Sequence, residues 1–417
     1  MNLPDVTGKP FHKGFLFYLL CGVAWVCLVF QVTTHVVFVP LPGGDAFVGV
    51  DYPKHRDAAI EVLQGICPQK KEYMGFNYPT FTALPFIFLA WLTPQQAAMT
   101  WTLLMRGFIL AGILLVIFGM RPRGEPVSET PLDFFQTLCV HRYSCMAMAM
   151  SLFIPVYFDL HVGNIQPFIF FLIVLFCVLL THGFDKTAGV ILAAVCLIKL
   201  TPVFFLPALF FSRRYRVLIA WGCAILVYAA LLCVTGWWAW DWYLVREVLP
   251  HVGHYWQGIS FSLSAFLALL FPQIIHDKTS YDIASKGIGM VILVSLFVFL
   301  FYGTRAAQKS KNDLFWRDAI ALASMPLVIA SPLVEYLHFT CVVPAWLFWC
   351  QDIMDRRQGK YFFTLSFFLW GGVFVGKQGL ESFGSVHNIQ LVYFSTASLA
   401  LLWFLQGMRM ISQRMDK

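Results

Sequence analysis

The sequence predicts an all-α, polytopic integral membrane protein, and composition and apolar run length are the observations that predict it. Hydrophobic residues make up 59% of the 417 residues, and only 12% are Asp, Glu, Lys or Arg, about half the share of a soluble domain. A soluble fold would have to cover this apolar surface with polar groups, whereas lipid tails solvate an apolar exterior. We therefore expect one transmembrane domain over residues 1–417 with about ten to twelve spans.

The apolar runs set the predicted spans, because a membrane helix needs about 20 mainly apolar residues. They lie at about 14–38, 97–119, 143–160, 163–181, 216–236, 285–303, 315–332, 335–352, 361–376 and 389–407. Two longer polar loops, about 39–78 and 237–284, interrupt the series. Each loop is too short for a core of its own.

Two further apolar segments, 79–93 and 187–211, contain residues that interrupt helices, namely Pro79, Pro85, Pro94, Lys199, Pro202 and Pro207. Broken helices at membrane depth are tolerated where they line a cavity. Either both segments cross, or both are re-entrant. The second arrangement, which we favour, returns Arg121, Arg123 and Arg142 to the cytoplasm and moves the turn at 163–166 outside.

Short basic connections give the orientation, because Lys and Arg are enriched in cytoplasmic loops. They lie at 212–216, 304–317, 356–360 and 409–417. The loops 39–78 and 237–284 then face outward. The formal charge of +7 is explained by contact with anionic lipid headgroups, and no pattern typical of nucleic-acid binding is present.

The first outer loop has the densest set of ionisable side chains: Asp45, Asp51, Lys54, His55, Arg56, Asp57, Glu61, Lys70, Lys71 and Glu72. A solvated loop is one interpretation. The order of the residues favours another, because Asp51-Tyr52 is followed by Ala58-Ala59, then Leu63-Gln64-Gly65, then Tyr78-Pro79 and an apolar run.

This order resembles glycosyltransferase family 87, whose members are membrane mannosyltransferases of the GT-C class that use polyprenyl-phosphate sugars. The family's Tyr-Pro-Pro has Thr80 at its third position here. Further motifs follow in the family's order. They are Gly163-Asn164-Ile165-Gln166 with the amides exchanged, Lys199-Leu200-Thr201-Pro202 with Arg213-Arg214, Leu249-Pro250 with Ser262-Leu263, and Ser331-Pro332 with Glu335 and His338.

The resemblance implies an inverting transfer, which needs one general base. A phosphate leaving group departs without a proton, so the acid–base carboxylate pair of a glycosidase is not required. An aspartate has an ordinary pKa of about 3.9 and can accept a hydroxyl proton near pH 7. Asp51, just beyond the first span, is the expected base. Asp45 is the competing candidate and Asp57 a weaker one.

The leaving phosphate gains charge in the transition state, so cations and polar donors should lie near it. We expect Lys199 and His338 to bind the donor phosphate. Glu335 lies one turn before His338 on the same helix face, and a structural Glu–His pair is the alternative. A snorkelling Lys199 is likewise the alternative to a functional one. The remaining expected binding residues are Tyr78, Asn164, Gln166 and Arg56.

The expected reaction moves a hexose, with mannose implied by the resemblance, from a polyprenyl-phosphate sugar to a lipid or glycan acceptor. The resemblance implies a bacterial inner membrane and a site on its periplasmic face. The histidines His251 and His254 lack a third ligand, so we expect no metal and no cofactor. The rival interpretation is a transporter or flippase, whose signature would be inverted repeats. A catalytically inactive assembly subunit is a third.

Overall fold

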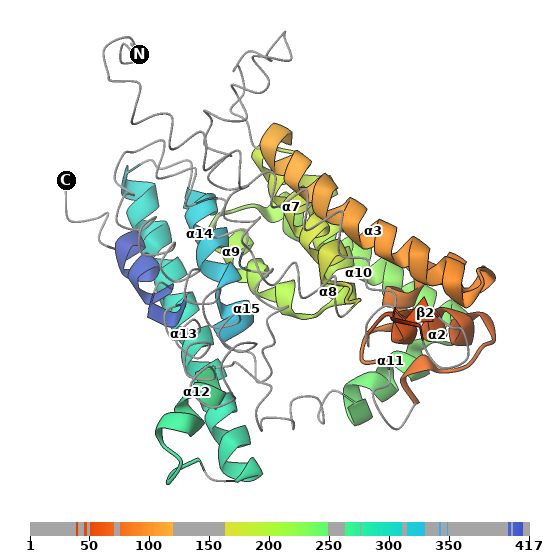
Figure 1. Cartoon of the computed structure of the whole chain (residues 1–417). Helices are drawn as coiled ribbons and strands as arrows, with labels where there is room; N and C mark the ends of the chain where they lie inside the picture. The colour runs from red at the N-terminus through yellow and green to blue at the C-terminus, as the bar shows by residue number, and fades with distance from the viewer. Residues whose placement is uncertain are drawn as a thin grey trace, which may run out of the picture.

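The computed structural model describes residues 39–40, 46–47, 51–70, 76–119, 163–248, 263–275, 277–310, 315–329, 342, 348, 399–401 and 403–411. Within these ranges the chain is almost entirely helical (Figure 1). The sheet they contain is one antiparallel pair of two-residue strands, β1 (Val39–Pro40) and β2 (Ala46–Phe47). The expected helical membrane protein is confirmed.

Three of the described helices are long and apolar enough to cross a membrane: α3 (Pro94–Leu114), α10 (Tyr215–Thr235) and α13 (Lys278–Ser310). At 1.5 Å per residue, α10 rises about 32 Å, close to the thickness of a bilayer's hydrocarbon core of about 30 Å. Its outer face is apolar and uncovered, with Val234 87% exposed and Leu226 70% exposed. Lipid tails can solvate such a face, whereas water would not.

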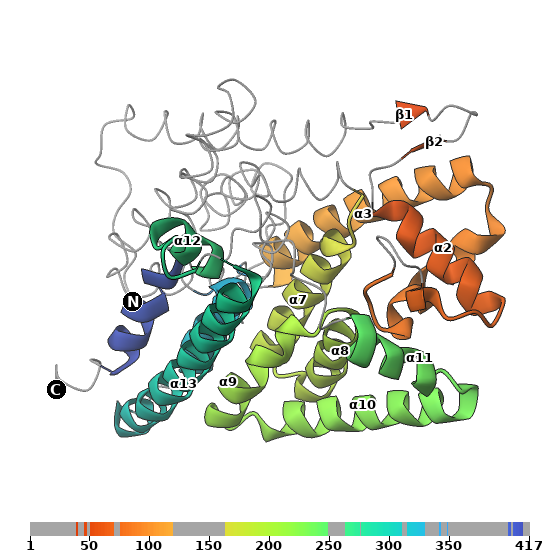
Figure 2. The same cartoon turned by 90° about the horizontal axis from the view of Figure 1, so that it is seen from below.

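The helices of the central bundle pack in series, as Figure 2 shows. Helix α3 packs against α7 (Gln166–Thr181), α7 against α8 (Asp185–Ile198), and α8 against α10. Gly189 of α8 makes the last contact possible, because a Cβ there would collide with the carbonyl oxygen of Val217 and lie 2.9 Å from the amide nitrogen of Trp221. Small residues allow membrane helices to approach this closely.

The segment 187–211 enters and leaves the bundle at the same end. Helix α8 stops at Ile198, and Lys199 is extended, with φ −143° and ψ 123°. A 3₁₀ turn, η5 (Thr201–Phe204), and α9 (Phe205–Phe211) then lead the chain back. The Arg214 guanidinium lies 3.0 Å from the Asp185 carboxylate, so the two ends of the segment meet. We call this the basic end of the bundle; it carries Arg213, Arg214, Arg305 and Lys309.

The segment 79–93 lies beside α2, and its Leu92 carbonyl accepts a hydrogen bond from Arg56. It forms a twelve-residue 3₁₀ helix, η3 (Thr80–Trp91), that packs along α2 (Tyr52–Leu63). We call this the Asp51 end. From there α3 runs to the basic end, where Nε2 of His182 lies 2.6 Å from the Gly119 carbonyl oxygen at the close of a π-helical turn, η4 (Leu115–Gly119). Whether both segments cross or both are re-entrant stays a prediction.

Other sequence-based boundaries need correction. The expected outer loops contain helices: α2 and η2 (Pro68–Lys70) in the first, and α11 (Trp238–Tyr243), η6 (Leu244–Val248), α12 (Leu263–Leu270) and the start of α13 in the second. The predicted run 315–332 is divided into α14 (Phe315–Ser324) and α15 (Pro326–Ile329), because Pro326 supplies no backbone N–H. The predicted spans 14–38, 143–160 and 361–376, and nearly all of 335–352, lie outside the described residues.

An aromatic cage around His55 fixes α2 to the bundle. The imidazole is fully buried and stacks on Trp101 of α3, with 5.0 Å between ring centroids and 20° between planes. Tyr78, Phe76 and Phe86 surround it, with centroids 5.2 to 6.3 Å away. Neither ring nitrogen has a hydrogen-bond partner among the described residues. Burial therefore lowers the pKa of His55 to about 4, which keeps the ring neutral at pH 7.

Replacing Gly189 by Ala should destabilise the protein, because the new methyl group would meet the backbone of α10 and the backbone cannot move aside. We expect a loss of about 1–3 kcal/mol in the free energy of unfolding, measured in detergent. Gly222→Ala on α10 is the matched control, since a Cβ there meets no atom within 4 Å. Equal stability of the two variants would contradict the close α8–α10 contact.

Stability should fall below pH 6.5 because of His55. The unfolded imidazole takes up a proton near pH 6.5, whereas the buried ring resists protonation until about pH 4. The unfolded state therefore binds more protons in this window, and stability rises with pH. Between pH 6.5 and 5 we expect a loss of about 2 kcal/mol, measured by denaturant unfolding. His55→Phe should remove this part of the pH dependence; an unchanged profile in the variant would argue against it.

Candidate functional site

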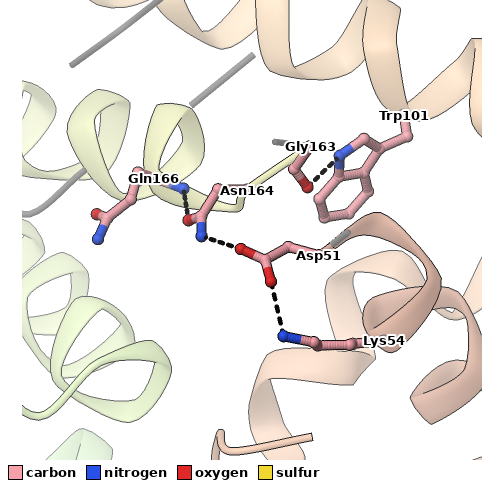
Figure 3. Close-up of polar contacts among 6 residues, drawn as sticks. All are labelled: Asp51, Lys54, Trp101, Gly163, Asn164 and Gln166. Atoms are coloured by element: carbon pink, nitrogen blue, oxygen red, sulfur yellow. Dashed lines mark hydrogen bonds and ion pairs between the residues drawn. The ribbon is translucent and has the colours of Figure 1, made fainter. Parts of the chain in front are cut away.

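The Asp51 carboxylate connects two parts of the chain that are far apart in sequence. Asp51 occupies the N-cap position of α2, yet its side chain makes no capping hydrogen bond to its own helix. One oxygen, Oδ1, lies 2.7 Å from Nζ of Lys54, and the other, Oδ2, accepts a hydrogen bond of 2.6 Å from Nδ2 of Asn164 (Figure 3). The usual local use of an N-cap aspartate is thus replaced by a tertiary contact.

The turn before α7 fixes the orientation of Asn164. Gly163 has φ +72°, a left-handed conformation that favours glycine, and its carbonyl accepts a 3.0 Å hydrogen bond from the indole N–H of Trp101. Oδ1 of Asn164 accepts the backbone N–H of Gln166 at 3.0 Å. The amide must therefore present its NH₂ group to Asp51, and the hydrogen bonds define which way it faces.

This arrangement leaves the Asp51 carboxylate able to act as a base. A carboxylate has about four lone-pair positions, and Lys54 and Asn164 use one each. The side chain is 15% exposed, so a further group can reach it. A hydroxyl hydrogen-bonded to a remaining lone pair would be held in line for proton transfer.

Tyr52, the residue after Asp51, has a buried hydroxyl. Its ring lies 5.8 Å from Trp101, and its O–H has no hydrogen-bond partner among the described residues. Burial raises the pKa of Tyr52 to about 12, with the nearby Arg56 charge opposing this shift. The phenol therefore stays neutral at pH 7 and is a possible donor to a ligand.

Asp241 organises a second polar cluster at the Asp51 end, and the sequence reasoning did not single it out. Its Oδ1 accepts the backbone N–H and the hydroxyl of Thr80, at 2.8 and 2.7 Å. Its Oδ2 accepts the hydroxyl of Tyr228 at 2.7 Å. The available signal was a lone carboxylate inside the aromatic run Trp237–Tyr243.

The structure separates the expected binding residues. Asn164 contacts Asp51, while the Gln166 side chain is buried and points away from it (Figure 3). Tyr78 packs against His55, and Arg56 donates a 3.3 Å hydrogen bond to the Leu92 carbonyl.

Lys199 follows α8 on another element. The preceding carbonyl of Ile198 lies 3.5 Å from the Thr82 hydroxyl of η3, which brings the end of α8 next to η3. Asp45, Glu335 and His338 lie outside the described residues. Among the residues that the structure describes, no group of three His, Cys, Asp or Glu side chains could hold a metal ion.

The chain matches glycosyltransferase family 87 over residues 76–332, which is more than half of its length. The matched stretch contains Tyr78, Asn164, Gln166 and Lys199, whereas Asp51 precedes it and His338 follows it. No curated protein matches the chain. The chain belongs to glycosyltransferase family 87 and is a membrane glycosyltransferase.

Proposed function

We propose that this membrane glycosyltransferase moves a hexose, with mannose as the proposed sugar, from a polyprenyl-phosphate sugar to a lipid or glycan acceptor. The reaction inverts the anomeric carbon, uses Asp51 as its base and needs no cofactor or metal. Family membership supports the transfer reaction. The hydrogen bond between Asp51 and Asn164 is the observation that supports this particular site.

The contact is informative because it spans 113 residues and joins the outer segment to the matched family region. Asn164 is nearly buried, at 5% exposure, and is held by its own turn. A carboxylate that a rigid partner holds in one orientation needs little reorganisation during a reaction. Asn164 is therefore proposed as a positioning residue for Asp51.

In the proposed step, the acceptor hydroxyl attacks the anomeric carbon of the sugar. Its oxygen forms the new glycosidic bond while the bond from the anomeric carbon to the phosphate oxygen breaks. Asp51 takes the hydroxyl proton, and polyprenyl phosphate leaves with the bonding electron pair. The neighbouring ammonium of Lys54 keeps the carboxylate oriented before the transfer.

Recognition of the leaving phosphate is assigned to cations and polar groups at the Asp51 end. Lys199 is the proposed principal cation, because the extended residue that ends α8 adjoins η3 at that end. His338 with Glu335, and Tyr78, Gln166 and Arg56, are proposed to complete the binding of donor and acceptor. The basic end then faces the cytoplasm, and the Asp51 end faces the periplasm of a bacterial inner membrane.

The proposal predicts that Asp51→Asn abolishes transfer. The amide has nearly the same size as the carboxylate but cannot take the acceptor proton, so turnover should fall at least about 100-fold. The measurement is transfer from polyprenyl-phosphate-mannose by purified protein in detergent, with unfolding recorded in parallel to show that the variant is folded.

Asp57→Asn is the matched control for this experiment. It removes a second carboxylate from the same helix and should leave transfer close to that of the wild type. Retained transfer in Asp51→Asn would remove Asp51 from its role. A wild-type protein that uses no lipid-phosphate sugar would overturn the proposed donor and favour a transport function.

A further inference from the structure

A cavity of about 480 Å³ lies at the basic end of the bundle, apart from the Asp51 site. Its walls come from the start of α8, the turn between α9 and α10, the last part of α13 and the start of α14. The polar residues of its lining are Asp185, Ser212, Arg213, Arg214, Thr304 and Gln308. The proposed transfer reaction makes no use of this cavity.

Arg214 is held rigidly in one wall. Its guanidinium lies 3.0 Å from the Asp185 carboxylate and 5.1 Å from the centre of the Trp316 ring. The Asp185 contact uses a single terminal nitrogen, and an arginine has five N–H donors in a fixed plane. The side chain therefore keeps donors for a ligand without losing further conformational freedom.

Arg213 adopts a backbone conformation that is unfavourable for its residue type. It has φ +59°, and every other residue with positive φ in the described parts of the chain is glycine. Its N–H bonds to the Phe210 carbonyl, and the N–H of Arg214 bonds to the Leu209 carbonyl, which is the pattern that closes a helix on a left-handed residue. An arginine in this position costs about 1 kcal/mol relative to glycine.

The neighbouring turn has glycine at the equivalent left-handed position. Between α7 and α8, Gly183 has φ +76° and donates to Leu180, while Phe184 donates to Leu179. This turn has the same hydrogen-bond pattern and lies at the same end of the bundle. Because glycine closes one turn without strain, the arginine in the other suggests that its side chain serves a purpose.

The donors and the charge of the lining favour an anionic ligand. The Ser212 and Thr304 hydroxyls already donate to carbonyl oxygens of Ala208 and Leu300, at 2.6 and 2.7 Å. The two arginines are therefore the main donors that remain, and with Asp185 they give the lining a charge of about +1 at neutral pH. Phe211, Phe315 and Trp316 add apolar walls.

We propose that this cavity binds the phosphodiester headgroup of an anionic membrane lipid, with Arg213 and Arg214 as the phosphate donors. A phosphodiester carries one negative charge and matches the charge of the lining. Guanidinium groups bind phosphate oxygens in a fixed geometry, and basic pockets between membrane helices suit lipid headgroups. The apolar walls fit the glycerol part of such a lipid.

The test is a titration of the purified full-length protein in neutral detergent, with thermal unfolding as the readout. Short-chain phosphatidylglycerol should raise the unfolding temperature in a saturable way, and phosphatidylcholine of equal chain length should not. Arg213→Gly and Arg213→Asn should each weaken the apparent phosphatidylglycerol affinity roughly tenfold. Both replacements tolerate positive φ, so the fold should persist.

Two further measurements complete the test. Without lipid, Arg213→Gly should unfold at a higher temperature than the wild type, because it relieves the strained turn. Arg216→Gln removes a charge from the first turn of α10, outside the cavity, and should leave the affinity unchanged. The proposal is overturned if Arg213→Gly binds like the wild type, or if Arg216→Gln weakens binding equally. Equal stabilisation by inorganic phosphate would replace the lipid by a soluble phosphate and overturn the lipid assignment.

Discussion

The hydrogen bond between Asp51 and Asn164 is the constraint on which the candidate site depends. It joins α2 to the turn before α7, and each partner is held by other groups. Asn164 is fixed by the Gln166 N–H and by Trp101 through Gly163, while α2 is fixed by the His55 cage, which also uses Trp101. Trp101 thus supports both sides of the contact, which explains how the Asp51 carboxylate keeps its position.

The two broken segments give the bundle two chemically different ends. Lys199 and Pro202 lie where the segment 187–211 turns back between α8 and α9, whereas Pro85 lies inside η3. Backbone groups that leave regular helices can then be satisfied within the protein, as the contact between Thr82 and the end of α8 illustrates. The ion pair between Asp185 and Arg214 closes the opposite end, where basic residues can meet lipid headgroups.

Sequence reasoning predicted what depends on composition and run length. It placed α3, α7 and α10 within a few residues, because an apolar run of about 20 residues has few stable conformations in lipid. Sequence reasoning expected a loop where α2 lies. The charged residues of α2 obscure the sequence pattern of its packed face, which Tyr52, His55 and Ala58 form. Asp51 and Asn164 were both named, but their contact was not, since local sequence does not encode a hydrogen bond across 113 residues. Asp241 was missed for the same reason.

Asp241 also explains how this chain accommodates its departure from the family's Tyr-Pro-Pro motif. A second proline would stiffen the start of η3 through its ring and would supply no N–H. Thr80 instead donates both its backbone N–H and its hydroxyl to Asp241. Tyr228 binds the other carboxylate oxygen, so the acceptor is itself held in place. Hydrogen bonding to α11 thus restrains the same turn that proline would restrain covalently. Because η3 packs on α2, this restraint also supports the helix that begins at Asp51.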